Sequence, residues 1–242
     1  MEKLHTRNEL VLSLLWIVAY IFLYSAADAL SAEIGVLKIV TLPAAVFLTL
    51  VMLAYVRNRG LWTYYGLTGP KDAPPRACLY YVPFAVLATA NLWNGVALRS
   101  TALEILLFAA TMGCVGFMEE ILFRGLLFRA LAKKNLQTAI LVSSLTFGLG
   151  HIVNLFNGAA FLPTLLQILY ATSIGYLFTI FFVKTRSLIP CMVTHATINA
   201  LSIFAVEGGF GLQILYAVLL TVISLAYARY LNVTLRTAAA WE

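Results

Sequence analysis

The amino-acid sequence predicts an all-α, polytopic transmembrane helical bundle. Three observations predict it: an apolar composition, long apolar segments, and an uneven placement of basic residues. Hydrophobic residues make up 62% of the 242 residues and charged residues 11%, whereas soluble domains contain about 25% charged residues. The mean hydropathy is +0.92. This composition excludes an ordinary soluble enzyme, a disordered chain and a nucleic-acid-binding module, so no nucleic-acid partner is expected.

Eight segments are apolar enough to be predicted as membrane spans, because a spanning helix needs about 20 mainly apolar residues. They are Leu10–Leu30, Ile34–Val56, Cys78–Leu98, Leu103–Leu131, Leu136–Phe156, Leu162–Val183, Leu188–Val206 and Leu212–Tyr230. The first segment resembles a signal peptide, but its length favours an uncleaved anchor. The longest polar connection is too short for a second domain, so residues 1–242 are expected to form one membrane-embedded domain.

The basic residues fall on one side of the membrane if the eight segments alternate and the N-terminus is cytoplasmic. That side carries Lys3, Arg7, Arg57, Arg59, Lys71, Arg76, Arg129, Lys133, Lys134, Lys184, Arg186, Arg229 and Arg236. The other side carries only Arg99, together with Glu33, Glu104 and Glu207. Because cytoplasmic loops are enriched in Lys and Arg, both termini are predicted to be cytoplasmic. We expect a multi-pass protein of the cell membrane.

The fourth segment contains three charged residues, Glu119, Glu120 and Arg124. Charged groups inside a membrane are costly and usually mark function. Glu120 and Arg124 are spaced i,i+4, so they can form an ion pair. Glu119 points about 100° away from Glu120 around the helix and can face a cavity as a free base. Gly116, one turn earlier, would allow another helix to approach closely.

The fifth and seventh segments each contain a histidine. His151 follows Phe147 by one turn, and Gly148 and Gly150 suit close helix packing. His195 and Asn199 are spaced i,i+4 and face the same way, as donors to a developing oxyanion would. Each histidine taken alone is also compatible with a purely structural role.

These polar residues, on three segments of an apolar chain, predict a shared polar cavity, since isolated polar groups in hydrocarbon are unfavourable. Three functions are compatible with such a cavity. One is a peptidase with an activated water, and another is a proton-coupled small-molecule transporter that uses the same Glu and His residues as a relay. The third is a catalytically silent scaffold. The sequence shows no internal repeat of the kind found in many transporters.

The order Glu-Glu-x-x-x-Arg, Phe-x-x-x-His and His-x-x-x-Asn resembles the CPBP intramembrane proteases, a family of type II CAAX prenyl endopeptidases and bacteriocin-processing or self-immunity proteins. The motif-bearing core covers about residues 101–206. The resemblance implies an intramembrane endopeptidase that cuts a membrane-associated or lipidated, CAAX-type peptide. It implies that Glu119 is the general base and that His151 assists it. His195 and Asn199 would form the oxyanion site. The supporting residues would be Glu120, Arg124 and Phe147.

The resemblance also sets the expected partners, which are membrane lipid and a peptide or prenylated-protein C-terminus cut near the cytoplasmic leaflet. The cofactor stays open between none and a divalent metal such as Zn²⁺, held by Glu119, His151 and His195. The sequence lacks His-Glu-x-x-His, which favours metal-free catalysis. The relative depth of the two histidines in the membrane also stays open. His151 lies about four helical turns from the predicted cytoplasmic end of its segment, whereas His195 lies about two helical turns from the cytoplasmic end of its own. The oligomeric state is not predicted.

Overall fold

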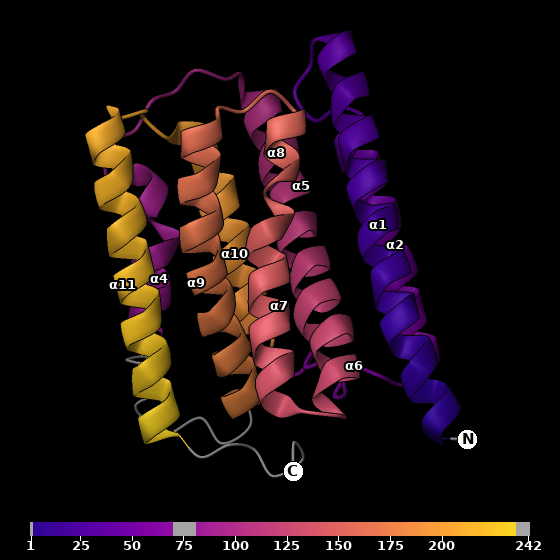
Figure 1. Ribbon diagram of the computed structural model, residues 1–242. Coiled ribbons are helices and arrows are strands. Elements are labelled where there is room, and N and C mark those ends of the chain that lie inside the picture. The colour runs from indigo at the N-terminus through magenta and orange to yellow at the C-terminus, as the bar shows by residue number, and fades with distance from the viewer. Residues whose placement is uncertain (1, 70–80, 236–242) are drawn as a thin grey trace.

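The computed structural model describes residues 2–69 and 81–235, which form a bundle of helices (Figure 1). The helices are α1 (Glu2–Ile34), α2 (Thr41–Asn58), α4 (Val82–Ala88), α5 (Ala102–Glu120), α6 (Phe128–Ala132), α7 (Leu136–Gly150), α8 (Val153–Phe156), α9 (Phe161–Thr185), α10 (Ile189–Leu201) and α11 (Phe210–Thr234). Shorter elements are the 3-10 turns η1 (Ala90–Leu92) and η3 (Ser202–Phe204) and the π-helical segment η2 (Ile121–Leu127). In this part of the chain the only strand-like contact is an isolated bridge between Val96 and Ala205. The predicted all-α class is confirmed.

Among the described residues, six helical stretches are long and apolar enough to cross a membrane, so the chain is an integral multi-pass membrane protein. They are Glu9–Ile34, Thr41–Asn58, Ala102–Ala132, Leu136–Phe156, Phe161–Thr185 and Phe210–Thr234. These stretches correspond to six of the eight predicted segments. The predicted seventh segment is a shorter apolar helix, Ile189–Phe204.

The predicted third segment, Cys78–Leu98, differs from the expected continuous helix. Its first three residues lie outside the described residues, and α4 is followed by η1 and an irregular stretch. The Asn91 amide donates to the carbonyl of Ile198 at 2.6 Å, and the Asn94 amide donates to the carbonyl of Val206 at 3.0 Å. These side-chain bonds tie the segment to the end of α10, and they compete with the regular helical bonding that hydropathy alone predicts.

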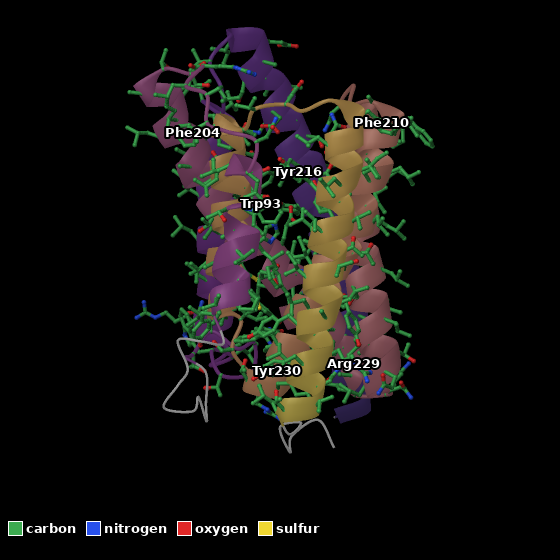
Figure 2. The ribbon with its side chains drawn as sticks, turned by 90° about the vertical axis from the view of Figure 1, so that its left-hand side faces the viewer. Trp93, Phe204, Phe210, Tyr216, Arg229 and Tyr230 are labelled. Carbon is green, nitrogen blue, oxygen red and sulfur yellow. The ribbon has the colours of Figure 1, made fainter. Side chains whose placement is uncertain are left out.

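Successive helices alternate in direction, so that α1 starts and α11 ends at the same end of the bundle (Figure 1). We call this end the basic end, because the described residues there include Arg57, Arg59, Lys133, Lys134, Lys184, Arg186 and Arg229. Figure 2 shows Arg229 near this end of α11 and Phe210 at the opposite end. Three other predicted members of the set, Lys71, Arg76 and Arg236, lie outside the described residues. The helix directions bring these basic residues to one end of the bundle, as expected. The cytoplasmic location of the basic end remains a prediction.

Helix α5 packs between α2 and α10. It contacts α2 on one side and α10 on another, while α7 packs against α9 and α9 against α11. Aromatic side chains of α4 and α9, among them Phe84, Phe178 and Phe181, fill the core on the α10 side. Large apolar side chains such as Phe22 on α1 are exposed, as expected for helices that face lipid. The bundle therefore buries the second half of the α5–α6 stretch among other helices.

Candidate active site

The two adjacent glutamates at the end of α5 have different environments. The Glu120 side chain is fully buried, whereas 20% of the Glu119 side chain is exposed. A helix turns by about 100° per residue, so neighbouring side chains reach different surroundings. Glu120 points into the protein core and Glu119 lines a cavity. The expected separation of the two carboxylates is therefore present in the structure.

Glu120 connects Arg124 to His195. Its Oε1 accepts a hydrogen bond from Arg124 Nη1 at 3.0 Å, which confirms the predicted i,i+4 ion pair. The same oxygen lies 3.0 Å from His195 Nδ1. Because a carboxylate can only accept, the Nδ1 atom must carry the hydrogen. Glu120 thereby fixes the orientation of the imidazole, and the Nε2 atom of His195 faces Glu119 Oε2 at 3.7 Å.

The Arg124 guanidinium is fully buried, and aromatic rings cover it. It lies 4.1 Å from the centroid of the Phe147 ring, and its Nε atom donates to Thr179 Oγ1 at 3.4 Å. A side chain at Gly175 of α9 would come within 2.9 Å of both Arg124 Nη2 and the Phe147 ring. Gly175 thus provides the space for this arginine, a role that the sequence analysis did not identify.

A π-helical turn follows the glutamate pair directly. In η2 the Phe128 N–H bonds to the carbonyl of Phe123, five residues earlier, and Ser143 of α7 donates to the same carbonyl at 2.8 Å. Such turns are rare and occur frequently at functional sites. The wider turn places Arg124 within the core, on the side of the α5–α6 stretch that faces α7 and α9.

Close contact between α5 and α10 brings His195 to the glutamates. A Cβ atom at Gly116 would lie 2.8 Å from the backbone N and the Cβ of Ala196, the residue after His195. The predicted close approach at Gly116 is confirmed. Of the two glycines before His151, Gly148 packs closely against Thr172 of α9, but Gly150 meets no neighbouring helix and instead lines a cavity. The packing role predicted for Gly150 is therefore wrong.

Phe147 separates the two histidines. Its ring centroid lies 5.6 Å from that of His151 and 5.4 Å from that of His195, both in edge-on arrangements. The predicted packing of Phe147 against His151 is confirmed. His151 caps the C-terminal end of α7, and its Nδ1 atom lies 3.3 Å from the Phe147 carbonyl. Both histidine rings lie against the same Phe147 ring, so the two histidines lie close together although their segments differ in length.

Tyr20 of α1 is a site residue that the sequence analysis missed. Its hydroxyl donates to Glu119 Oε1 at 2.7 Å, so Glu119 has a partner outside the motif-bearing core. The Tyr20 and Tyr24 rings lie 4.4 Å apart. A sequence signal for this contact existed, because Tyr20, Tyr24 and Asp28 repeat at i,i+4 on an otherwise apolar helix and so share one face.

Two cavities meet at the predicted site residues. The first has a volume of about 280 Å³ and is lined by Tyr20, Glu119, His151 and Asn199, among others. The second has a volume of about 180 Å³, and its lining includes His195 and apolar side chains of α4, α9 and α11. Phe147, His151, Gln167 and Asn199 line both. His195 and Asn199 share the second cavity, in agreement with their expected common face.

The metal alternative expected from the sequence would use Glu119, His151 and His195 as ligands. Among the described residues, no three side chains of His, Cys, Asp or Glu come together closely enough to hold a metal ion. A catalytic zinc site needs three protein ligands around one point. The expected alternative set of Glu119, His151 and His195 does not converge in this way.

A family model described as "Rce1-like: Type II CAAX prenyl endopeptidase Rce1-like" matches residues 101–201. The matched region carries all three motifs and confirms the resemblance found in the sequence. At the level of this family the match supports a CAAX-type intramembrane protease, and the family acts on prenylated C-terminal peptides. Neither the curated proteins nor the solved structures gave a match to the chain.

Proposed function

We propose that this protein is an intramembrane endopeptidase in which Glu119 activates a water molecule for attack on a peptide bond. The observation that carries the proposal is the position of Glu119. Its Oε2 atom faces His195 Nε2 at 3.7 Å beside a cavity, while its Oε1 atom is held by Tyr20. One carboxylate oxygen is thus available to a water molecule, next to a group that can bind the carbonyl oxygen of a substrate.

In the proposed mechanism His195 carries a hydrogen on each ring nitrogen. Glu120 lies 3.0 Å from both Arg124 and His195, and Glu119 lies 3.7 Å from His195. Buried charge is costly unless it is paired. The Nδ1–H is donated to Glu120, and the Nε2–H is directed to the side of Glu119.

In the proposed reaction Glu119 takes a proton from water, and the resulting hydroxide forms a bond to the carbonyl carbon. The negative charge that develops on the carbonyl oxygen is stabilised by the Nε2–H of His195 and the side-chain amide of Asn199. When the carbon–nitrogen bond breaks, Glu119 returns the proton to the leaving amine. No metal takes part, and the failure of the donors to converge supports that choice.

His151 has the geometry of a helper to Glu119. Its Nδ1–H donates to the Phe147 carbonyl, which leaves Nε2 as an acceptor, and the ring lines both cavities. An acceptor in this position can hold the second hydrogen of the attacking water. The apolar lining of the smaller cavity, with Ile174, Phe178 and Leu220, suits an apolar part of the substrate, such as the prenyl group of a CAAX peptide.

The test is turnover by Glu119→Gln in detergent with a farnesylated CAAX peptide as substrate. General acid–base catalysis contributes about 10²–10⁴-fold, so we expect a loss in this range. Glu104→Gln is the matched control, because Glu104 lies on the same helix in an exposed N-terminal capping box that glutamine can also form. Full activity of Glu119→Gln would exclude Glu119 as the base.

The same assay separates a peptidase from a proton-coupled transporter. A detergent micelle has no proton gradient, so product formation there requires hydrolysis. Gradient-driven uptake in vesicles without any cleavage would favour the transporter instead.

A further inference from the structure

We infer that Gln167 of α9 is a substrate-binding residue of this site, and that its side-chain amide holds the peptide backbone beside the bond that is cut. The inference rests on the proposed function and deepens it, because it names the part of the substrate that the protein recognises there. None of the three motifs includes Gln167. Only the fold brings it to the other site residues.

Gln167 lies where the two cavities of the site meet. Among the described residues, four line both cavities. Three of the four, Phe147, His151 and Asn199, belong to the motifs, and Gln167 is the fourth. Its position at the junction therefore matches that of the motif residues, although it comes from a helix that carries no motif.

The proposed reaction takes place at this junction. Glu119 lines the larger cavity and His195 the smaller one, and their facing atoms, Oε2 and Nε2, are 3.7 Å apart. A carbonyl group that is attacked by the water of Glu119 and held by His195 must lie between the two cavities. The wall that the cavities share, which includes Gln167, is therefore next to the reacting peptide bond.

Only one end of the Gln167 amide is used within the described structure. Asn154 Nδ2 donates to Gln167 Oε1 at 2.9 Å. Among the described residues this is the one hydrogen bond of the Gln167 side chain. The nitrogen of a side-chain amide carries two N–H donors, so both remain for a molecule in the cavities. The bond from Asn154 also fixes the orientation of the amide group.

A peptide backbone is the partner that suits these donors. Each residue of a peptide offers a carbonyl oxygen as acceptor, whereas a prenyl chain offers none. Gln167 stands between Leu166 and Ile168 in an apolar stretch of α9, where unpaired donors are costly. A substrate carbonyl removes that cost. Because the contact is made to the backbone, it does not depend on the side chains of the peptide.

Gln167 and Asn199 then have different tasks. Asn199 donates to the carbonyl oxygen that becomes negative, and that bond strengthens in the transition state. Gln167 donates to a neighbouring carbonyl that does not react, so its bond is equally strong before and during the reaction. Uniform binding of this kind lowers KM and leaves kcat unchanged. The two amides are therefore distinguished by which kinetic constant they affect.

The first test replaces Gln167 by methionine, an unbranched apolar side chain that adapts to irregular spaces. We expect Gln167→Met to raise KM for the farnesylated CAAX peptide about 10-fold, which is equivalent to about 1.4 kcal/mol, with kcat unchanged. The matched control is Asn154→Leu, which removes the same bond within the protein but keeps both donors of Gln167. It should raise KM clearly less. A wild-type KM in Gln167→Met, or equal changes of KM in both variants, would overturn the inference and assign the pair to helix packing.

The second test changes the substrate. Farnesylated CAAX peptides are made with one backbone ester each at positions that are not cut, because an ester carbonyl is a weaker acceptor than an amide carbonyl. At the position held by Gln167 the ester should raise KM for the wild type but not for Gln167→Met, since both changes weaken the same bond. Equal effects on both proteins at every position would contradict the inference and leave the protease proposal standing. Full activity of Glu119→Gln would instead contradict the protease proposal, and the inference with it.

Discussion

The two faces of the site differ in packing, although their residues are neighbours in the sequence. On the closed face Glu120, Arg124 and Phe147 are buried and bonded to one another or stacked. On the open face Glu119 and His151 line a cavity and keep unused acceptor atoms. The comparison indicates that one glutamate maintains the geometry while its neighbour is free for chemistry. The predictions below test this division, from the largest expected effect to the smallest.

Arg124→Leu should cause the largest loss. It leaves the Glu120 carboxylate buried without its cationic partner, and breaking a buried pair costs about 3–5 kcal/mol. We expect a much lower free energy of unfolding, measured in detergent, together with lost turnover. Arg59→Leu is the control, because Arg59 is exposed at the end of α2. Wild-type stability of Arg124→Leu would show that the closed face does not hold the site together.

Asn199→Ala should lower turnover without lowering stability. Loss of one oxyanion donor costs about 10²–10³ in kcat, and Asn199 is only half-buried beside both cavities. The measurement is kcat and the unfolding temperature of the same preparation. Asn157→Ala is the matched control, since Asn157 lines the outer part of the larger cavity away from His195. A drop in stability with unchanged kcat would assign Asn199 to helix packing.

Gly116→Val should separate α10 from α5. The added side chain overlaps Ala196 and the Met192 carbonyl, and overpacking costs about 1–3 kcal/mol. We expect reduced stability and a larger loss of turnover, because His195 moves away from both glutamates. A Cβ added at Gly113 on the same helix meets no atom within 4 Å, so Gly113→Val serves as the control. Equal behaviour of the two variants would contradict the importance of this helix contact.

Tyr20→Phe should have the smallest effect. It removes one hydrogen bond to the Glu119 carboxylate, and such bonds to charged groups contribute about 1.5–3 kcal/mol. We expect kcat to fall about 10-fold with KM unchanged, because Tyr20 positions the base and does not bind substrate. The matched control is Tyr24→Phe, whose hydroxyl is buried in the described structure without a hydrogen-bond partner. A change in KM alone would assign Tyr20 to substrate binding.

Much of the fold and part of the site followed from the sequence for identifiable physical reasons. Hydropathy predicts long helices because a membrane demands about 20 apolar residues. The i,i+4 rule predicts the Glu120–Arg124 pair because both residues lie on one helix. These are local patterns, so the sequence order alone determines them.

Contacts between distant segments were not predictable in the same way. The bond from Tyr20 to Glu119 joins residues 99 positions apart, and nothing in the motif-bearing core indicates it. The bonds of Asn91 and Asn94 to the end of α10 also depend on tertiary packing, so the third segment was predicted as a continuous span.

The most direct test of the central claim compares Glu119→Gln with Glu120→Gln for turnover and thermal unfolding in one detergent. Only Glu120 is bonded to the buried Arg124. The account predicts that Glu119→Gln loses turnover but unfolds at or above the wild-type temperature, whereas Glu120→Gln unfolds at a lower temperature. Turnover at the wild-type rate in Glu119→Gln, or unchanged unfolding in Glu120→Gln, would contradict it.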